Sequence, residues 1–231
     1  MLRSMLVIRL PKVTSTQDFA FAIHGKLNED FVVVAEEQTK ARGRFGRSWY
    51  SPKGGLWFTL VKKGVKVESI PLLPLASSLA VRHALSDYVD GRIRWPNDVV
   101  VRDLKIAGIL VDAEVLGNST SALIGVGINV NVKDLPEDLG ATSLYREIGR
   151  EVELEKLLNS VINLISRYMD LNSSSLIKEV NDFLSLRGSR VRLSTTSGEF
   201  VCIVEEVDFQ GRLKTSCGLF AAEDVVRVVK L

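Results

Sequence analysis

Residues 36–55 read EEQTKARGRFGRSWYSPKGG and concentrate glycine and basic side chains. Four cations follow one another without an intervening acid: Lys40, Arg42, Arg44 and Arg47. Gly43 and Gly46 let the backbone take positive φ and approach a ligand closely, and planar guanidinium groups match phosphate or carboxylate oxygens. The stretch therefore predicts an anion-binding loop. The alternative is a solvated basic turn in a hairpin.

Apolar, strand-forming runs lie on both sides of this loop. Phe31–Ala35 reads FVVVA and Leu56–Val61 reads LWFTLV, which are the β-branched and aromatic residues that strands prefer. The first run delivers Gln38 to the mouth of the loop. Because functional residues gather on loops held by rigid strands, we expect a binding site there.

The composition is that of an ordinary globular protein. Of 231 residues, 46% are hydrophobic and 25% are charged, enough for one large core or for a large domain with a small one. The net charge of +2 is too small for a general nucleic-acid footprint. The apolar runs are strand-length, and the N-terminus has too short an apolar core for a signal peptide. We therefore expect a cytoplasmic protein without a membrane segment.

The two cysteines, Cys202 and Cys217, lie near the C-terminus and away from the loop. Their spacing does not match a metal site, and reduced thiols are the norm in cytosolic proteins. We expect free thiols in the core or at a sheet edge. The alternative, a disulfide between them, would suggest a thermophile.

Periodicity and breaker residues predict the other elements of a main domain over residues 1–187. Ser15 is a candidate helix N-cap, with Asp18 near the positive end of the helix dipole. Gly125 and Gly127 alternate onto one face of an apolar strand and would leave a slot there; the alternative is close packing against the sheet. Strands are expected at Met5–Leu10, Ile93–Trp95, Val99–Val101, Ile106–Val111 and Ala122–Ile128. Helices are expected from Ser15 to Gly25, at Leu72–Tyr88, at Glu153–Asp170, and at Leu176–Leu186 after a cap at Ser173–Ser175.

The pattern changes beyond Gly188 to short β-rich runs separated by Ser-Gly, Gln-Gly and Cys-Gly turns. Such spacing is typical of a small all-β domain. We therefore predict a second domain over residues 188–231, with strands at Val191–Leu193, Phe200–Val207, Leu213–Ser216 and Val225–Val229.

Polar groups capable of chemistry recur at fixed points between these elements. They are Ser15 and Thr16, Gln38, the basic loop, the turn Trp95-Pro96-Asn97-Asp98, Lys105 before an Ala-Gly-Ile-Leu-Val run, and Gly125 to Asn129. Their order and spacing resemble the biotin protein ligases from about Val13 to the C-terminus. That family has a Ser-Thr-Asn helix start, Gln before a Gly-Arg-Gly-Arg loop, Lys-Trp-Pro-Asn-Asp, Lys before Ala-Gly-Ile-Leu-Val, and Gly-x-Gly-x-Asn.

Three positions depart from the family pattern. Gln17 stands where the family usually has Asn, and Ala41 replaces the first loop glycine. Arg94 replaces the common Lys before Trp95 and keeps the charge. Because Gln17 and Ala41 are expected in or near the ligand pocket, the affinity for biotin can differ while the chemistry stays the same.

The resemblance implies an α+β fold of the class II synthetase-like biotin/lipoate ligase type, with a mixed central β-sheet, packed helices and a small C-terminal SH3-like β-barrel. It also implies a ligase. The carboxylate of biotin attacks the α-phosphate of ATP, giving biotinyl-5'-AMP, and a lysine of a biotin carboxyl carrier protein then displaces AMP. No enzyme nucleophile is needed, so we expect His24 and His83 to be surface or helix residues rather than catalysts.

The resemblance assigns roles to single residues. Its catalytic set is Lys105, Arg44, Arg47 and Asp98, where the cations screen the repulsion between two anionic substrates. Asp98 would hold the Mg²⁺ that accompanies ATP, or orient Lys105 or the incoming amine. The biotin-binding set is Ser15, Thr16, Gln17, Gln38, Arg42, Gly43, Arg44, Lys105 and Gly108. The ATP-binding set is Arg44, Arg47, Trp49, Asn97, Lys105 and Asn129.

The resemblance bears on partners as well. The expected acceptor is the carrier domain of a biotin-dependent carboxylase, and the family commonly forms homodimers. No DNA partner is expected, since the motifs begin near Thr14 and leave no room for the DNA-binding domain of ~60 residues that some members carry. Two rivals stay open. One is lipoate ligation by the same adenylate chemistry, against which the Arg-Gly-Arg loop argues; the other is a non-catalytic nucleic-acid binder.

Overall fold

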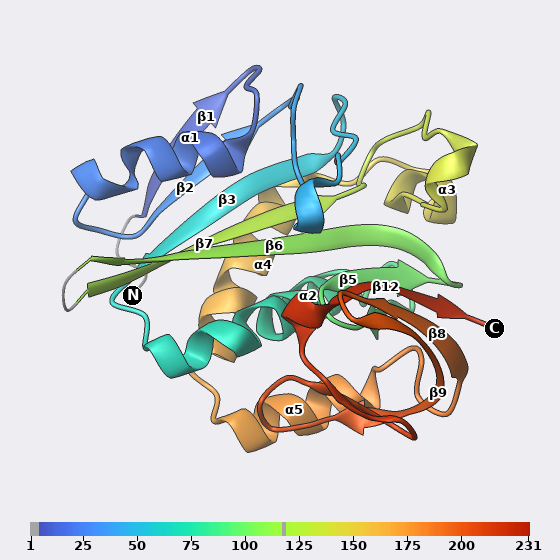
Figure 1. The fold of residues 1–231 in the computed structure, drawn as a ribbon. Coiled ribbons are helices and arrows are strands. Elements are labelled where there is room, and N and C mark those ends of the chain that lie inside the picture. The colour runs from blue at the N-terminus through green and yellow to red at the C-terminus, as the bar shows by residue number, and fades with distance from the viewer. Residues whose placement is uncertain (1–4, 117–118) are drawn as a thin grey trace.

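The computed structural model describes residues 5–116 and 119–231, which form five α-helices and two β-sheets (Figure 1). The helices are α1 (Thr16–Ile23), α2 (Leu73–Ala84), α3 (Leu144–Ile148), α4 (Leu154–Met169) and α5 (Ser173–Asp182). The strands of the first sheet are β1 (Leu6–Leu10), β2 (Phe31–Ala35), β3 (Leu56–Lys63), β4 (Arg92–Arg94), β5 (Asp98–Val101), β6 (Leu104–Leu116) and β7 (Ser119–Ile128). Those of the second are β8 (Arg190–Thr195), β9 (Gly198–Val207), β10 (Leu213–Thr215), β11 (Gly218–Phe220) and β12 (Val225–Lys230).

The larger sheet is mixed, with the strand order β1-β2-β3-β7-β6-β5-β4. Strands β1 and β2 run parallel, and every other neighbouring pair in the sheet is antiparallel. The basic loop joins β2 to β3, which pair in register from Phe31 opposite Val61 to Ala35 opposite Trp57. The predicted α+β class with a mixed central sheet is confirmed.

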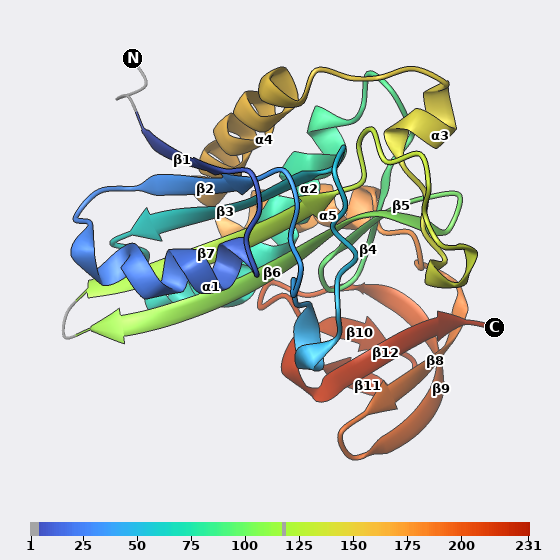
Figure 2. The same ribbon diagram turned by 90° about the horizontal axis from the view of Figure 1, so that it is seen from above.

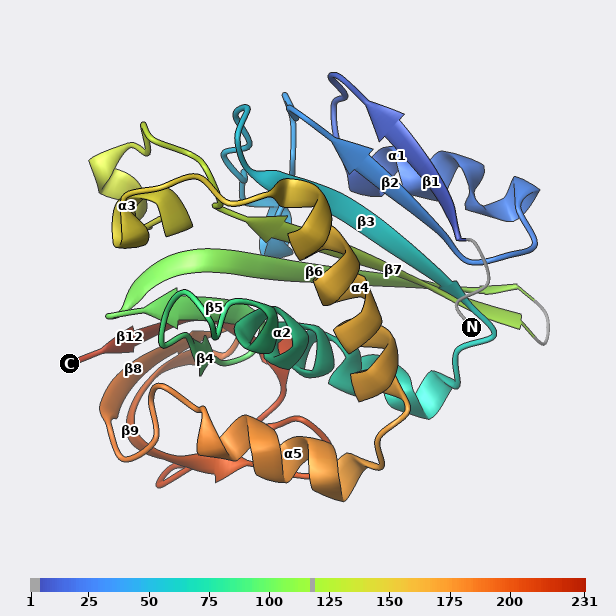
Figure 3. The same ribbon diagram turned by 180° about the vertical axis from the view of Figure 1, so that it is seen from behind.

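Helices cover both faces of this sheet. Side chains alternate along a strand, so neighbouring residues of β2 face opposite layers. Val33 packs with Ala20 of α1 on one face, whereas Val32 belongs to the core formed with α2 and α4 on the other. Figures 1 and 3 show α1 on one side of the sheet and α2 and α4 on the opposite side. The N-terminus of α1 thereby reaches the end of the sheet where the basic loop lies.

Helix α4 follows the predicted three- and four-residue spacing, which directs Leu158 and Val161 into the core. The boundaries of two helices differ from expectation, and α5 also ends at Asp182, four residues before Leu186. Helix α2 ends at Ala84, four residues before Tyr88. Helix α5 is capped by Asn172, whose Oδ1 accepts from the Ser175 N–H at 2.9 Å, so the three serines form the first turn instead of the cap.

The second sheet is antiparallel, with the order β11-β10-β9-β8-β12, and it begins two residues after Gly188. Figure 2 shows it against the end of the main sheet where the basic loop lies. Trp95 donates from Nε1 to the Gly211 carbonyl at 2.9 Å, and Asn181 bonds both backbone groups of Val207. Buried residues of this sheet join the main hydrophobic cluster, so the two sheets share one core. The domain boundary at residue 188 and the closure of a barrel remain predictions.

Cys202 and Cys217 form a disulfide that joins β9 to the turn between β10 and β11. The expectation of free thiols is therefore wrong. Pairing of β9 with β10 brings the two residues together, with their Cα atoms 5.6 Å apart. That proximity depends on strand register, which sequence spacing alone does not reveal.

The helices were also compared with the length and hydropathy of membrane-spanning segments. Among residues 5–116 and 119–231, none of the helices combines the length and the apolar character that crossing a bilayer requires.

Candidate active site

Two adjoining cavities lie where the basic loop meets the main sheet. The smaller, of about 150 Å³, is lined by the start of α1, by β6 and β7, and by the loop. The larger, of about 560 Å³, lies between the loop, the β4–β5 turn, the segment before α3, and β12. Six residues line both: Arg44, Arg47, Ser48, Trp49, Asn97 and Lys105. A reaction between the contents of the two cavities has to take place at this shared wall.

The candidate residues surround the two cavities, and several of them line both. All nine residues of the predicted biotin set line the smaller cavity. All six of the predicted ATP set line the larger one, together with Asp98. The structure therefore brings together residues far apart in the sequence, although the role of each residue stays a prediction.

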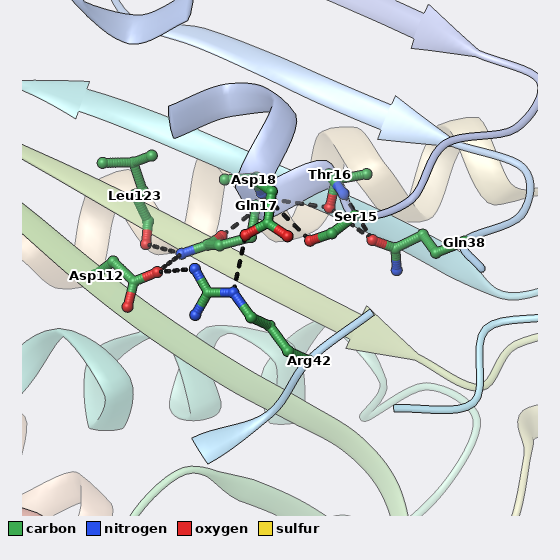
Figure 4. A network of polar contacts seen from close by, with 9 residues as sticks. Ser15, Thr16, Gln17, Asp18, Gln38, Arg42, Asp112 and Leu123 are labelled. Carbon is green, nitrogen blue, oxygen red and sulfur yellow. Dashed lines mark hydrogen bonds and ion pairs between the residues drawn. The ribbon is translucent and has the colours of Figure 1, made fainter. Parts of the chain in front are cut away.

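The polar end of the smaller cavity is built on the first turn of α1 (Figure 4). Ser15 Oγ accepts from the Asp18 N–H at 3.2 Å, which makes Ser15 the helix N-cap, as predicted. Gln38 Oε1 accepts from Thr16 N at 2.8 Å and from Thr16 Oγ1 at 3.1 Å. Its Nε2 donates to Ser51 Oγ at 3.1 Å. These bonds fix a row of hydroxyl and amide groups facing the cavity.

Glycines on β6 and β7 make room for two larger side chains. A Cβ at Gly127 would lie 2.7 Å from Trp49 Nε1, and one at Gly108 would lie 2.9 Å from the Trp49 ring. A Cβ at Gly125 would lie 2.6 Å from Gln17 Oε1. The predicted slot therefore exists, and Trp49 and Gln17 occupy it. In the described part of the chain, Trp49 Nε1 is a buried donor without a hydrogen-bond partner, so it is available to an acceptor on a ligand.

Lys105 lies at the shared wall beside a carboxylate and an aromatic ring. Its Nζ is 2.6 Å from Asp98 Oδ1 and 4.8 Å from the centre of the Trp49 ring. Asp98 Oδ2 accepts from Arg94 Nη2 at 3.1 Å. Desolvation lowers the pKa of Lys105 below its ordinary value, although the Asp98 carboxylate opposes this shift. The negative charge of an incoming anion would stabilise the protonated form of Lys105 and so raise its pKa again.

Arg44 and Arg47 present their charges to the two cavities in different ways. Arg44 Nη2 donates to the carbonyls of Ala222 and Val225 in the C-terminal segment, the latter at 3.1 Å. Desolvation and the neighbouring charge of Arg47 lower the pKa of Arg44. Within the described residues, Arg47 has no carboxylate at ion-pair distance, and its Nε donates to the Arg44 carbonyl at 3.3 Å. Two adjacent guanidinium groups carry positive charge that an anionic ligand would neutralise, so the prediction that they bind an anion stands as a prediction.

Arg42 differs from the other loop cations because carboxylates already hold it. Its Nε donates to Asp18 Oδ1 at 2.9 Å and its Nη2 to Asp112 Oδ2 at 2.8 Å. Desolvation lowers the pKa of Arg42, but the hydrogen bonds and charges of the two carboxylates raise it overall. Arg42 therefore anchors the loop, and its charge is less available to a ligand than that of Arg47.

Two asparagines shape the larger cavity through backbone contacts. Asn97 Nδ2 donates to the Ile109 carbonyl at 2.6 Å, and its Oδ1 lies 3.5 Å from Arg44 Nη1. Asn129 is buried and donates from Nδ2 to the Thr142 carbonyl at 2.9 Å. Both side-chain amides thus tie together backbone segments that line the larger cavity, and Asn97 also lies beside Arg44.

Sequence reasoning missed three contributors to the site. Asp112 binds both Gln17 and Arg42, and Thr59 lies 3.0 Å from both Thr16 Oγ1 and Gln17 Oε1. All of β12 lines the larger cavity. A polar Thr59 within the apolar run 56–61 could have indicated a site residue, whereas no local sequence feature of β12 indicates that it lines a cavity.

Both histidines lie outside the two cavities. His24 is buried in the 3₁₀ turn at the end of α1, where it contacts Glu114 and the Phe21 carbonyl, so it is a helix-end residue and not a surface one. His83 is a helix residue, as expected, and stacks on Tyr168 at 5.7 Å. Among the described residues no group of three or more His, Cys, Asp or Glu side chains is arranged to hold a metal ion.

A model of the biotin/lipoate A/B protein ligase family matches residues 7–129, more than half of the chain. The matched span includes the basic loop, Asp98, Lys105 and Asn129. The chain belongs to this family.

Curated family members extend the similarity. The biotin–[acetyl-CoA-carboxylase] ligase of Mycobacterium tuberculosis is 31% identical over 246 residues, covering 98% of this chain and 90% of that protein. The bifunctional ligase/repressor BirA of Bacillus subtilis is 30% identical over 215 residues, covering 87% of this chain and 66% of that protein. The chain thus spans slightly less than two thirds of the Bacillus relative's length.

Solved structures of the family show the same architecture. The biotin protein ligase from Aquifex aeolicus in complex with biotin and ATP superposes with a TM-score of 0.82 at 26% identity, covering 98% of this chain and 99% of that one. The Leishmania major ligase in complex with biotinyl-5-AMP gives a TM-score of 0.67 at 26% identity, with 98% of each chain covered. The likeness therefore includes the second sheet as well as the first.

Proposed function

We propose that this protein is a biotin protein ligase that forms biotinyl-5'-AMP from biotin and ATP and transfers the biotinyl group to a lysine of a biotin carboxyl carrier protein. The observation that carries the proposal is the wall shared by the two cavities. It places Lys105, Arg44 and Arg47 between a small pocket with a polar end and a larger pocket. The Aquifex and Leishmania structures, whose titles name biotin with ATP and biotinyl-5-AMP, support it.

The first half-reaction joins two anions at this wall. A carboxylate oxygen of biotin attacks the α-phosphorus of ATP, the bond to the β-phosphate breaks, and pyrophosphate leaves. Lys105 would screen the approaching charges and hold the developing charge on the phosphoryl oxygens. Arg44 and Arg47 would bind the phosphates, because neither has a carboxylate within ion-pair distance in the described residues.

The smaller cavity would bind the ring system of biotin. The ureido group of biotin offers two N–H donors and one carbonyl acceptor. Ser15, Thr16 and Gln38 supply hydroxyl and amide groups at the polar end of the cavity, where hydrogen bonds already orient them. Gly43 would let the ligand approach the backbone closely, and Gly108 would leave room for the Trp49 ring and the Lys105 chain beside it. The valerate chain would then lead toward Lys105.

The larger cavity would bind ATP, with Trp49 and Asn129 in its lining. Mg²⁺ would enter with the phosphates of ATP, which supply oxygen ligands, and would neutralise part of their charge. Asp98 is a carboxylate of this lining, but both of its oxygens already bind cationic side chains. This arrangement supports an orienting role of Asp98 toward Lys105.

The second half-reaction requires that the carrier lysine reach the acyl-adenylate, and it needs no nucleophile from the enzyme. The ε-amine of a carrier lysine attacks the acyl carbon of the adenylate, AMP leaves, and the amine loses a proton. The proposed acceptor is the carrier domain of a biotin-dependent carboxylase. We further propose a cytoplasmic homodimer, as is common in the family, and sedimentation of the purified protein would test the dimer.

The deciding experiment is incubation of the purified protein with Mg-ATP and either biotin or lipoate, without carrier, followed by mass spectrometry of the acyl-adenylate. We expect biotinyl-AMP alone. Lipoyl-AMP would keep the mechanism and overturn the substrate. Neither product from a folded sample, together with salt-dependent binding of an oligonucleotide, would favour the nucleic-acid binder.

A further inference from the structure

Gln17, which departs from the family's usual Asn, reaches across the sheet. It leaves the first turn of α1, passes over Gly125 on β7, and donates from Nε2 to the Leu123 carbonyl at 2.9 Å and to Asp112 Oδ2 at 3.1 Å (Figure 4). Both amide hydrogens of Gln17 are therefore used, and Oε1 lies 3.0 Å from Thr59 Oγ1. Gln17 thus closes the inner end of the smaller cavity as a wall, with no donor left for a ligand.

One carboxylate oxygen holds both this wall and the basic loop. Asp112 Oδ2 accepts from Gln17 Nε2 and also from Arg42 Nη2 at 2.8 Å. Asp112 projects from β6, where it pairs with Leu123 of β7 in the main sheet, so its backbone is held by the sheet. Hydrogen bonds to an ionised carboxylate are stronger than those between neutral groups. The carboxylate therefore fixes α1, the loop and the sheet relative to one another.

The same network continues to the far end of the loop. Thr59 Oγ1 links Gln17 to Thr16, Thr16 donates to Gln38, and Gln38 donates to Ser51, whose Oγ donates to the Trp49 carbonyl at 3.3 Å. The loop from Lys40 to Trp49 is thus attached near its start through Arg42 and at its end through Trp49. Among residues 5–116 and 119–231, Asp112 is the one that bonds both Gln17 and Arg42.

We propose, on the basis of the proposed function, that Asp112 is a positioning residue for biotin activation. It would set the wall of the biotin pocket through Gln17 and hold the basic loop over that pocket through Arg42. Without this carboxylate, Arg42 keeps only Asp18, and Gln17 loses one of its three partners. Biotin would then have to order both the wall and the loop when it binds, and this entropic cost weakens binding.

The test compares Asp112→Asn with wild-type protein in two measurements. The first is calorimetric binding of biotin without ATP, where we expect the dissociation constant to rise about tenfold or more, since charged hydrogen bonds are lost. The KM for biotin should rise in parallel, with the KM for ATP changed less than twofold. Asp112→Glu, which keeps the charge, should recover part of the affinity. Unchanged biotin affinity in folded Asp112→Asn would overturn the proposal.

The second measurement needs no ligand, so it separates this inference from the proposed function. Proteolysis of the empty protein at residues 40–49 should be faster in Asp112→Asn than in wild type. Asp18→Asn, which removes a partner of Arg42 but does not touch Gln17, should accelerate cleavage and disturb biotin binding less. Glu155→Gln removes the Arg9–Glu155 pair outside both cavities and should change neither. Equal loop cleavage in wild type and Asp112→Asn would contradict the anchoring role, even if the wild-type protein formed no biotinyl-AMP.

Discussion

Lys105 Nζ and Asp98 Oδ1 lie 2.6 Å apart at the junction of two cavities, and Asp98 is itself held by Arg94. The pair is local in the fold because β5 and β6 form a hairpin that places Asp98 opposite Gly108. Partial burial makes the charged form of an ammonium group less favourable, and a carboxylate partner compensates for part of the lost solvation. Asp98 supplies that compensation in the empty site, and substrate anions would add to it.

Replacement of Lys105 by alanine should abolish most adenylate formation while the protein stays folded. The ammonium group would be missing where charge develops on the phosphoryl oxygens, so single-turnover formation of biotinyl-AMP should fall by ~10²-fold or more. Circular dichroism serves as the folding control. A folded Lys105→Ala protein with normal adenylation would show that the charge at this position is dispensable.

The lowered pKa of Lys105 predicts the alkaline limit of the reaction. Adenylation should decline as pH rises through a value below the ordinary 10.5, because the deprotonated amine carries no charge. Between the lowered pKa of the folded protein and 10.5, Lys105 is protonated in the unfolded chain but deprotonated in the folded one. The contribution of Lys105 to the free energy of unfolding therefore rises with pH over this range. In an active Lys105→Arg variant the alkaline decline of the adenylation rate should begin at higher pH, because a guanidinium group keeps its proton there. The same alkaline decline in both proteins would assign it to another group.

Asp98→Asn tests whether this carboxylate orients Lys105 or binds Mg²⁺. Both oxygens of Asp98 contact cations, so we expect an orienting role. The variant should slow adenylation about tenfold and move the alkaline limb to lower pH, because Asp98 raises the pKa of Lys105. The Mg²⁺ concentration for half-maximal rate should stay within a factor of about two. A large increase in that concentration would identify Asp98 as a metal ligand.

We expect the loop from Lys40 to Trp49 to be mobile without ligand and to become ordered over the adenylate. Arg42 anchors the start of the loop, whereas glycine and the repulsion between Arg44 and Arg47 loosen the part beyond this anchor until an anion binds. Limited proteolysis should therefore cut the loop in the empty protein, and biotin with ATP should suppress that cut. Cleavage at another exposed segment, such as the turn at residues 196–197, provides the internal control. Ligands that left loop cleavage unchanged would argue against closure.

The Cys202–Cys217 disulfide should stabilise the second sheet. Closing a loop with a sequence separation of 15 residues is worth up to about 3 kcal/mol in the chain-entropy estimate. Urea unfolding with and without reductant should reveal this difference. Thiol titration of the unreduced, denatured protein should detect no free thiol. Two free thiols in that titration would show that the bond is not formed.

Much of the fold followed from local patterns in the sequence. Helix α4 was found from apolar spacing, the start of α1 from Ser15, and the strands on either side of the basic loop from β-branched runs. These features depend on hydrogen bonds and side-chain periodicity within one element, which neighbouring residues determine. The same holds for the order of the polar motifs, which indicated the family before any contact was known.

Contacts between distant segments were not predictable in this way. The disulfide, the buried position of His24 and the approach of β12 to Arg44 each depend on how sheets and helices pack together. Asp112 belongs to the same class, since it meets Gln17 and Arg42 from positions 95 and 70 residues away.

Local patterns in the sequence, with the family resemblance that they carry, were enough for the α+β class, for most element positions and for the polar residues of the smaller cavity, but not for β12 at the larger one. Packing in three dimensions places Lys105, Arg44 and Arg47 on one wall, pairs Arg42 with carboxylates, and completes the larger cavity with the second sheet. Local patterns and tertiary contacts differ in how far apart along the chain the interacting residues lie. Local backbone preference is encoded within a few residues, whereas burial and charge pairing depend on groups that only the folded chain brings within a few ångströms.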